Sequence, residues 1–507
     1  MSEKRLTLIF SGNDFKYELE GVCKLFFPVE SFNFLFLDSG GGTLPEDGSD
    51  CCLITRLEGR RSTLISVAAR IGGRIKTAGE RLDSSSDELE KSCEFRLGRL
   101  LYRVLSELTG KRPEWGVLTG VRPVKLINKL RGSGLDFDGI RKKLTEEYLV
   151  TEEKVRIGYE TAVNQDAAVS GMPKDSFSLY VSIPFCPTRC SYCSFVSQTV
   201  SSFKKLMPEY VERLCDEIAY TSGLLGDGGP RLDTVYFGGG TPTSLEPGQL
   251  DRIMKTIASL FDLSGVREYT VEAGRPDTVT YDKLMVIKEN GGGRISVNPQ
   301  TVHDSVLLQI GRRHTAAQFF ESYSLARSVG FKAINVDLIA GLPGDSISGF
   351  KESVDRIIEL SPENITVHAL SVKRASDMMA SRDIGDDSLT ESMIAYATQR
   401  LLLEGYKPYY LYRQKNQLGN QENIGWTRPG LEGIYNINIM EEIQSIVAVG
   451  AGGTTKILSG TDPGKGIQRF FNPKYPLDYI RSFDTVLKRK ETAMGLLLGS
   501  ESDKDRK

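Results

Sequence analysis

The stretch SIPFCPTRCSYCSF, residues 182–195, contains three cysteines, Cys186, Cys190 and Cys193, with the spacing C-x3-C-x2-C. Thiolates are the protein ligands of iron–sulfur clusters and of many zinc sites, and both kinds of centre usually take one more ligand than this loop offers. The stretch therefore predicts a metal centre with one position left to fill. What fills that position decides the chemistry of the chain.

The other cysteines provide no good further ligand. Cys215 lies inside a stretch with helical spacing, away from this loop. Without a secretion signal the thiols should stay reduced, and the cysteines outside the loop are predicted to be small buried hydrophobic residues. These are Cys23, Cys51, Cys52, Cys93 and Cys215. The spacing favours an iron–sulfur cluster with one open iron, and a zinc site completed by a distant cysteine is the alternative.

The composition weighs against several classes of function. The 507 residues include 64 Lys and Arg against 66 Asp and Glu, so no global basic field attracts nucleic acid. The N-terminus does not resemble a signal peptide, and no apolar run reaches the roughly 18 residues of a membrane span. We expect a cytoplasmic protein with no nucleic-acid partner and no membrane span. Only His303, His314 and His368 could supply imidazole ligands.

The middle of the chain alternates short apolar, β-branched runs with stretches of helical spacing. Such alternation predicts βαβ units, a parallel sheet and an α/β fold class. Each run ends in small or polar residues, which suits a binding face at the carboxyl ends of the strands. The sequence therefore predicts a partial (β/α)6 barrel. Its predicted strands are residues 178–185, 233–240, 268–274, 294–300, 333–343 and 364–372.

Accessory regions are predicted on both sides of this barrel. After a helix at about 389–405, the stretches YYLYRQKNQLGNQENIGWTRPG and VAVGAGGTTK read as loops, and the tail ESDKDRK reads as disordered. The predicted organisation is a small α/β domain at 1–80, a helical region at 81–172, the barrel at 173–375 and an α+β covering domain at 376–507.

Five motifs carry a family resemblance over about residues 178–456: YVSIPFCPTRCSYCSF, VYFGGGTPT, TVEAGRPDT, RISVNPQ with LLQIGRRHT, and NVDLIAGLPG. In this order and spacing they resemble the radical S-adenosylmethionine (SAM) superfamily. Within it, the sequence resembles the oxygen-independent coproporphyrinogen III oxidase (dehydrogenase) family. The N-terminal region and the segment YLYRQKNQLGNQENIGW are most similar to the longer subgroup of anaerobic Gram-positive bacteria.

The resemblance implies what fills the open position. In this superfamily the amino and carboxylate groups of SAM chelate the unique iron of a [4Fe–4S] cluster, here held by Cys186, Cys190 and Cys193. An electron from the cluster splits SAM and yields a 5′-deoxyadenosyl radical. A low-potential donor such as flavodoxin or ferredoxin is the implied redox partner. The cofactor supplies the difficult chemistry, while the protein supplies position and shielding.

The resemblance also implies contacts to SAM. Gly239, Gly240 and Thr241 end the second predicted strand, where glycines let backbone carbonyls approach the methionine ammonium. Glu272 ends the third strand and suits the same ammonium. Arg312, in IGRRHT, can pair with the SAM carboxylate in a bidentate fork.

The nucleoside end of SAM has further predicted partners. Gln300 ends the fourth strand and can hydrogen-bond the ribose. Asp337 lies in an otherwise apolar strand, where a buried carboxylate is costly unless it is paired, and the ribose hydroxyls are a suitable partner. Tyr192 is expected against the adenine, and Ala369 offers backbone groups to the adenine edge.

The sequence departs from the family in two places. The family usually has Tyr-x-His before Ile-Pro-Phe-Cys, whereas this chain has Tyr180 and then Ser182. Tyr180 and Glu272 are nevertheless the residues assigned to catalysis. The best-known members carry a fourth cysteine where this chain has Phe195, a change shared with the haem chaperones. Both departures argue against simply carrying over two family properties, a second SAM site and the decarboxylation reaction.

The reaction implied by the resemblance is oxidative decarboxylation of coproporphyrinogen III to protoporphyrinogen IX in haem and porphyrin biosynthesis. The alternatives are a haem-binding chaperone and a radical SAM enzyme acting on another tetrapyrrole. The chaperones carry a His-Asn pair where this chain has Glu422 and Asn423, which favours catalysis. Candidate partners of the substrate propionates are Lys373, Arg374, Arg413, Lys415 and Arg428.

Overall fold

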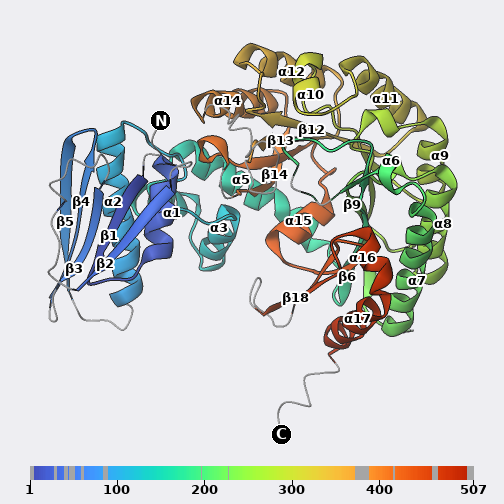
Figure 1. Cartoon of the computed structure of the whole chain (residues 1–507), viewed down its shortest axis with the longest axis horizontal. Helices are drawn as coiled ribbons and strands as arrows, with labels where there is room; N and C mark the ends of the chain where they lie inside the picture. Colours follow the sequence, from blue (N-terminus) through green and yellow to red (C-terminus); the bar gives the residue numbers. More distant parts are fainter. Residues whose placement is uncertain are drawn as a thin grey trace, which may run out of the picture. The chain divides into compact units, whose positions relative to one another are not determined.

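The computed structural model describes residues 5–27, 31–38, 44, 52–58, 62–83, 89–193, 195, 197–226, 228–371, 387–414, 417–458 and 466–499. The chain divides into two compact units (Figure 1). The first, here called the accessory unit, comprises Met1–Tyr159 and Arg413–Gln421. The second, the barrel unit, comprises Glu160–Tyr412 and Glu422–Lys507. Each unit is described by itself.

The accessory unit contains a five-stranded sheet in the order β2-β1-β3-β4-β5. Its strands are β1 (Arg5–Ser11), β2 (Ser31–Leu37), β3 (Cys52–Glu58), β4 (Ser62–Ile71) and β5 (Arg74–Asp83). β1 runs parallel to β2 and β3, and β3, β4 and β5 form an antiparallel meander.

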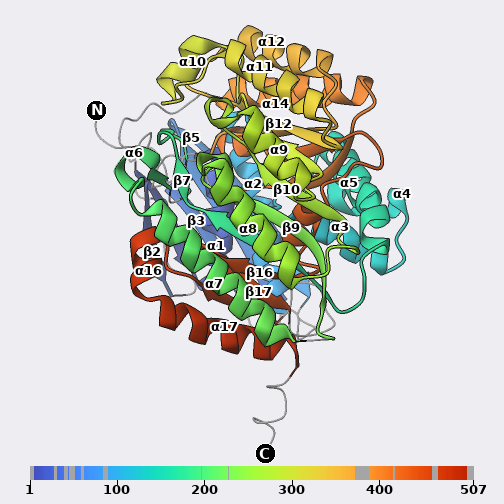
Figure 2. The ribbon, with the colours of Figure 1, turned by 90° about the vertical axis from the view of Figure 1, so that its right-hand side faces the viewer.

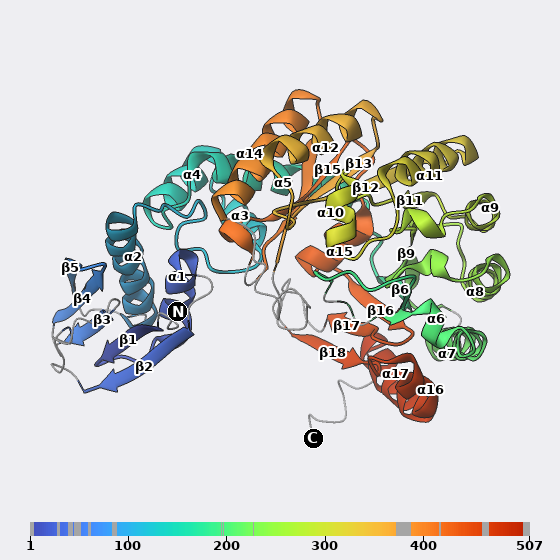
Figure 3. The same cartoon turned by 45° about the horizontal axis from the view of Figure 1, so that its top comes forward.

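Helices α1 (Lys16–Phe26) and α2 (Leu89–Thr109) pack on one face of this sheet, as Figure 3 shows. Alternate residues of β1, among them Leu6 and Phe10, face these helices and form the core with residues such as Leu19 and Leu101. The period of two in β1 thus gives the sheet one apolar face. The unit continues with α3 (Pro123–Gly132) and α4 (Phe137–Glu146), and α5 (Glu152–Ser170) crosses the boundary between the units along the sequence.

The barrel unit is built on an 11-stranded sheet in the order β14-β15-β13-β12-β11-β10-β9-β6-β16-β17-β18. Its centre consists of parallel strands that follow one another in chain order, which confirms the predicted partial (β/α)6 barrel. These strands are β6 (Ser176–Ile183), β9 (Arg231–Gly239), β10 (Glu268–Glu272), β11 (Arg294–Ser296), β12 (Ala333–Ala340) and β13 (Asn364–Ala369).

Helices return the chain between these strands and cover the outer face of the sheet. Figure 2 shows α7, α8 and α9 side by side over the strands, and Figure 3 shows the helices in an arc around them. The larger ones are α7 (Met207–Leu225), α8 (Pro247–Leu260), α9 (Tyr281–Glu289), α11 (Ala316–Val329) and α12 (Ile347–Glu359). Short elements between them are β7 (Phe185–Cys186), β8 (Gln198–Thr199), α6 (Val200–Phe203) and α10 (Asp304–Gln309).

The C-terminal part corrects the sequence analysis. The predicted helix is present as α14 (Asp387–Leu403), but the two stretches interpreted as loops contain strands. β14 (Lys407–Tyr412) and β15 (Asn423–Thr427) add to the sheet beside β13. After α15 (Ile434–Glu441), β16 (Ser445–Val449) pairs in parallel with β6. β17 (Thr454–Leu458), β18 (Ile467–Phe471), α16 (Pro476–Arg481) and α17 (Phe483–Leu497) complete the unit.

The glycines in these stretches have a packing role that the composition does not reveal. A Cβ atom on Gly425 of β15 would lie 1.9 Å from Cε1 of Tyr410 on β14. The glycine therefore makes room for an aromatic ring of the neighbouring strand and does not mark a loop. In the ranges that the structure describes, none of the helices combines the length and the apolarity needed to cross a membrane.

Candidate active site

The three cysteines of the loop lie directly after β6, at the carboxyl end of the parallel strands. Cys190 is buried, while Cys186 and Cys193 are partly buried. Burial raises the pKa of the Cys193 thiol to about 11, and the neighbouring Cys190 and Cys186 thiols add to the rise. The three thiols are thus close enough to repel one another as thiolates. In the described ranges, no group of three or more Cys, His, Asp or Glu side chains is arranged to bind a single metal ion. A bound cationic centre would remove that repulsion.

The loop is anchored to the segment that follows α10. The Ser191 N–H donates to the Ile310 carbonyl over 3.0 Å, and the Thr188 hydroxyl donates to the Gly311 carbonyl over 3.1 Å. Gly311 has a φ of +77°, and a Cβ atom there would lie 3.0 Å from the Arg189 carbonyl. The IGRRHT motif therefore holds the cysteine loop by backbone contacts that only glycine allows at this point.

The glycine-rich end of β9 packs against the first cysteine. A Cβ atom on Gly240 would lie 2.6 Å from the Phe185 carbonyl and 3.0 Å from Sγ of Cys186. Gly239 has a φ of +107°, which L side chains rarely adopt. The Thr241 hydroxyl lies 3.4 Å from Sγ of Cys186. These residues thus form a cradle around Cys186, in addition to the role toward SAM that the sequence predicts for them.

Glu272, the last residue of β10, is a carboxyl group held in a poorly solvated place. Burial raises its pKa to about 7, a hydrogen bond from Tyr236 lowers it, and the charge of Asp337 raises it further. The Tyr236 hydroxyl donates to Oε1 of Glu272 over 2.6 Å. Near pH 7 the group can therefore be charged or neutral, and a cation nearby would favour the charged form.

An aromatic stack lies beside this carboxyl group. The ring of Tyr236 stacks on Tyr435 of α15 with 4.3 Å between centroids, and Tyr180 of β6 lies 6.2 Å from Tyr236 and 6.1 Å from Tyr435. Burial raises the pKa of Tyr180, and the Glu272 charge adds to the rise. Tyr180 therefore lies near Glu272 and inside an aromatic stack, while the catalytic role assigned to it stays a prediction. The sequence analysis missed Tyr236 and Tyr435, and the tyrosine in VYFGGG was the available signal for Tyr236.

Asp337 of β12 is the second carboxylate at this end of the barrel. Nδ2 of Asn298 donates to Oδ2 over 2.8 Å, and Nδ2 of Asn335 donates to Oδ1 over 2.7 Å. Nε2 of His368 lies 3.8 Å from Oδ2. Burial alone would raise the pKa of Asp337, but hydrogen bonding and the charge of His368 lower it, helped by Asn335. Asn298, in RISVNPQ, was not predicted as a site residue.

Gln300 is held by its backbone in the left-handed region, with a φ of +69°. Its N–H donates to the Asp337 carbonyl over 3.0 Å, and its carbonyl accepts from the Ile339 N–H over 3.0 Å. A bridge to β12 thus fixes a strained residue beside Asp337. Strain of this kind persists only where the surroundings determine it.

Arg312 is buried next to the cysteine loop. Its Nη1 donates to the Asn298 carbonyl over 2.6 Å and its Nη2 to the Gly274 carbonyl over 3.3 Å, while Nε is buried without a hydrogen-bond partner. Burial alone would lower its pKa, but the Tyr192 and Cys190 groups next to it raise it. An orphaned donor on a buried guanidinium fits a carboxylate ligand.

Other predicted contacts are already used inside the chain. The Ala369 N–H donates to Oδ1 of Asn423 over 3.0 Å. Arg428 lies 3.9 Å from the centre of the Tyr406 ring. In the accessory unit Nη2 of Arg413 donates to the Asn420 carbonyl over 3.1 Å, and Nη1 donates to the Leu118 carbonyl. Arg413 and Arg428 thus make contacts within the chain, and their role toward the substrate propionates stays a prediction. Lys373, Arg374 and Lys415 lie outside the described residues.

The residues at which the sequence departs from its family are also placed. Ser182 donates from its hydroxyl to the Ala451 carbonyl over 2.6 Å, and it is buried. Phe195 is 63% exposed, whereas Glu422 is 1% exposed. Nε2 of His303 lies 2.9 Å from the Gly349 carbonyl, and both ring nitrogens of His314 are buried without a hydrogen-bond partner.

Comparison with known proteins identifies relatives for most of the chain. The family description that matches is the radical SAM superfamily, over residues 180–357. The oxygen-independent coproporphyrinogen-III oxidase-like protein HemZ of Bacillus subtilis (strain 168) is 39% identical over 412 residues, which cover 79% of this chain and 81% of that protein. The heme chaperone HemW of the same organism is 37% identical over 197 residues, which cover 39% of this chain and 51% of the chaperone.

A solved structure shares the fold. The radical SAM enzyme coproporphyrinogen III oxidase (HemN) from Escherichia coli superimposes with a TM-score of 0.50 at 23% identity, covering 64% of this chain and 73% of the other.

Proposed function

Because the chain belongs to the radical SAM superfamily, and within it to the family of oxygen-independent coproporphyrinogen-III oxidase-like proteins, we propose that it catalyses oxidative decarboxylation of coproporphyrinogen III. Members of the superfamily use a [4Fe–4S] cluster and SAM. When bound, this pair supplies the one-electron cleavage of SAM and with it a carbon radical that abstracts hydrogen. The electron would come from a low-potential donor of the flavodoxin or ferredoxin class.

Cys186, Cys190 and Cys193 would hold the cluster, since they are the described cysteines that share one loop at the carboxyl end of the strands. The donor set fits, because mutual repulsion of the thiolates disfavours the metal-free charged state. The cradle of Gly240 leaves no room for a side chain next to Sγ of Cys186. A zinc centre would need a fourth protein ligand, and Cys215 is buried in α7.

The protein side of SAM binding follows from the charges at the strand ends. Glu272, held by the hydrogen bond from Tyr236, would accept a hydrogen bond from the methionine ammonium of SAM. Nε of Arg312 would donate a hydrogen bond to the SAM carboxylate. Asp337 and Gln300 would face the ribose, and Tyr192 the adenine. One observation carries this assignment: a carboxyl group with a pKa near 7 and a buried guanidinium with an unused donor lie at the same end of one parallel sheet.

The substrate would present a propionate to this end of the barrel. Hydrogen-atom loss from the β-carbon, followed by departure of CO2 and transfer of one electron to an external one-electron acceptor, would leave a vinyl group. Two such rounds give protoporphyrinogen IX. The Tyr180, Tyr236 and Tyr435 rings would exclude water from the site, because they are stacked on one another and Tyr435 is buried.

The test is anaerobic incubation of the cluster-loaded protein with coproporphyrinogen III, SAM and a reductant, followed by mass spectrometry. We expect monovinyl and divinyl products, with two CO2 released per substrate. Cleavage of SAM without either product would contradict the substrate assignment and favour another tetrapyrrole.

A haem carrier is the second candidate, because Phe195 stands where the oxidases have a fourth cysteine and a heme chaperone is among the relatives. Against it, Glu422 occupies the place of the chaperone histidine, and His303 and His314 are bonded or buried. A haem titration separates the two. A tight one-to-one complex that is lost in His368→Ala would overturn the enzyme assignment.

A further inference from the structure

A buried arginine that plays no part in the proposed reaction lies against the cysteine loop. Arg275 follows β10 in TVEAGRPDT and is only 2% exposed. Its guanidinium is held by Asp277 in a two-bond fork, with Nε to Oδ1 and Nη2 to Oδ2 both 3.0 Å. A buried charge of this kind is costly unless all its donors are hydrogen-bonded. The partners of the third nitrogen therefore matter.

The remaining nitrogen, Nη1, is directed at the cysteine loop. It donates to the Thr188 hydroxyl over 3.0 Å, to the Thr188 carbonyl over 3.3 Å, and to Sγ of Cys190 over 3.8 Å. The fork with Asp277 leaves the guanidinium little freedom to rotate. One side chain therefore joins the loop after β10 to both the backbone and a sulfur atom of the cysteine loop.

An N–H···S hydrogen bond to a sulfur that ligates a cluster changes the reduction potential of the cluster in a known direction. Reduction adds one electron, supplied by a low-potential donor, to a cluster, and no covalent bond is made or broken. Donors and positive charge near the sulfur stabilise the more negative, reduced state. Burial strengthens the effect, because the electrostatic interaction is screened less than in water.

We propose that Arg275 is a positioning residue that raises the reduction potential of the cluster through its bond to Cys190, while Asp277 partly offsets its charge. The inference rests on the cluster of the proposed function and on no particular substrate. It predicts effects of opposite sign for the two partners: loss of the guanidinium lowers the potential, and loss of the Asp277 charge raises it.

The experiment is an anaerobic redox titration of the cluster-loaded full chain, followed by electron paramagnetic resonance (EPR). For Arg275→Gln we expect the reduction equilibrium to weaken about tenfold, which for one electron equals about 59 mV toward lower potential. Asp277→Asn should move the potential upward. Arg275→Lys, which keeps the charge but loses the fork, should lie between wild type and Arg275→Gln.

Arg313→Gln is the matched control, because Arg313 is an exposed arginine two residues from Gly311. It should leave the potential unchanged. If Arg275→Gln and Asp277→Asn both load a cluster whose potential equals that of this control, the inference is wrong. If Arg275→Gln fails to retain iron, the upward shift in Asp277→Asn decides. A wild-type protein that assembles no cluster would instead contradict the proposed function.

Discussion

Asp233 and Glu272 lie at opposite ends of two neighbouring strands, and their surroundings differ. Asp233, near the start of β9, is fully buried and accepts from Nε and Nη2 of Arg267 over 2.6 and 2.7 Å and from Gln444 over 2.9 Å. Glu272, at the end of β10, accepts from a tyrosine hydroxyl, and its pKa is raised to about 7. The amino end neutralises its buried charge within the chain, whereas the carboxyl end keeps capacity for a cationic ligand.

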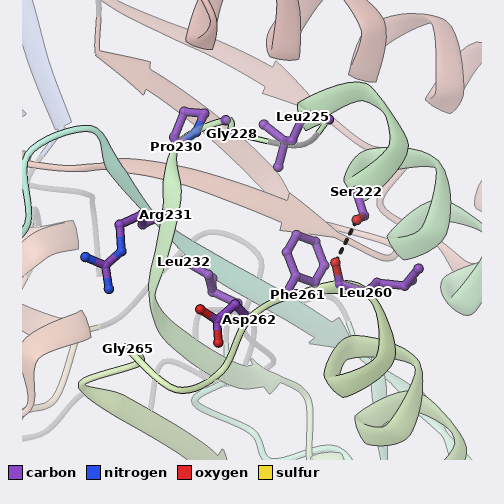
Figure 4. A pocket seen from close by; sticks show the side chains of 12 residues that line it. Ser222, Leu225, Gly228, Pro230, Arg231, Leu232, Leu260, Phe261, Asp262 and Gly265 are labelled. Carbon is purple, nitrogen blue, oxygen red and sulfur yellow. Dashed lines mark hydrogen bonds between the residues drawn. The ribbon is translucent and has the colours of Figure 1, made fainter.

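A cavity at the amino end sharpens this difference. It measures about 250 Å³ and lies where β9 begins, between the ends of α7 and α8 (Figure 4). Leu225, Leu232 and Phe261 contribute apolar walls, and the Ser222 hydroxyl donates to the Leu260 carbonyl over 3.0 Å. Asp262 at its rim accepts from the Ser264 N–H over 2.9 Å. This cavity has no buried charge without a partner among the groups described above. It is therefore weaker evidence for a functional site than the carboxyl ends of the strands, where the pKa of Glu272 is raised.

The largest expected effect concerns the metal centre. Cys186→Ala, Cys190→Ala and Cys193→Ala should each abolish iron binding, because each removes a thiolate that an open-iron cubane cannot replace. Iron and sulfide analysis after anaerobic reconstitution measures this. Cys215→Ala, which replaces a buried cysteine of α7, is the control and should keep a full cluster. Loss of iron in Cys215→Ala would contradict the claim that one iron of the cluster has no protein ligand.

At the amino end, Arg267→Met should destabilise the protein by about 3–5 kcal/mol, since it leaves Asp233 as a buried charge without its partner. Denaturant unfolding monitored by circular dichroism gives this free energy. Arg213→Met is the control, because Arg213 and Asp216 form an exposed pair that contributes little. Equal effects of the two substitutions would break the comparison between the ends of the sheet.

At the carboxyl end, Arg312→Ala should weaken SAM binding by about 2–5 kcal/mol, which is at least tenfold, because it removes a buried charged partner. Isothermal titration of the cluster-loaded protein measures the affinity. Arg313→Ala, the exposed neighbour, should bind SAM like wild type. A SAM affinity that Arg312→Ala leaves unchanged would remove Arg312 from the site.

Glu272→Gln should have the smallest effect on folding, and the size of this effect should depend on pH. In the ligand-free protein the raised pKa means that folded Glu272 holds a proton between its usual value of 4.5 and about 7, where the unfolded chain releases it. This contribution to stability is complete below about pH 4.5 and is lost as the pH rises through 7. The variant should therefore be more stable than wild type by about 1–3 kcal/mol at pH 8, and similar near pH 4.

Unfolding curves at several pH values test this, and SAM affinity gives a second measurement on the same variant. Wild-type affinity should fall as the pH drops below about 7, because the ammonium needs the charged carboxylate. Glu272→Gln should lose both the affinity and its pH dependence. A variant that is less stable than wild type at pH 8 would show that Glu272 acts as a structural charge, like Asp233.

The strands of the barrel and the three cysteines could be predicted because both are local signals. Apolar runs such as AINVDLIA, within Ala333–Ala340, mark parallel strands without knowledge of their neighbours, and the spacing of Cys186, Cys190 and Cys193 is visible in the chain itself.

The remainder depends on neighbours in space. Tyr236 was missed because its role comes from Glu272 on the next strand, and Asn298 because it faces Asp337 from another strand. Strands β14 and β15 were missed because Gly425 looks like a loop residue until Tyr410 is placed over it. One contact of Arg413 could not be predicted, because the Leu118 carbonyl that accepts from it lies 295 residues away in the sequence.

The central claim is that the cysteine loop holds a cluster with one iron open to SAM. The most direct test is the EPR spectrum of the reduced protein, recorded before and after SAM is added in the absence of substrate. The account predicts that SAM changes the g-values of the reduced cluster in wild type and in Cys215→Ala. A spectrum that SAM leaves unaltered, in protein that carries a complete reduced cluster, would contradict the account.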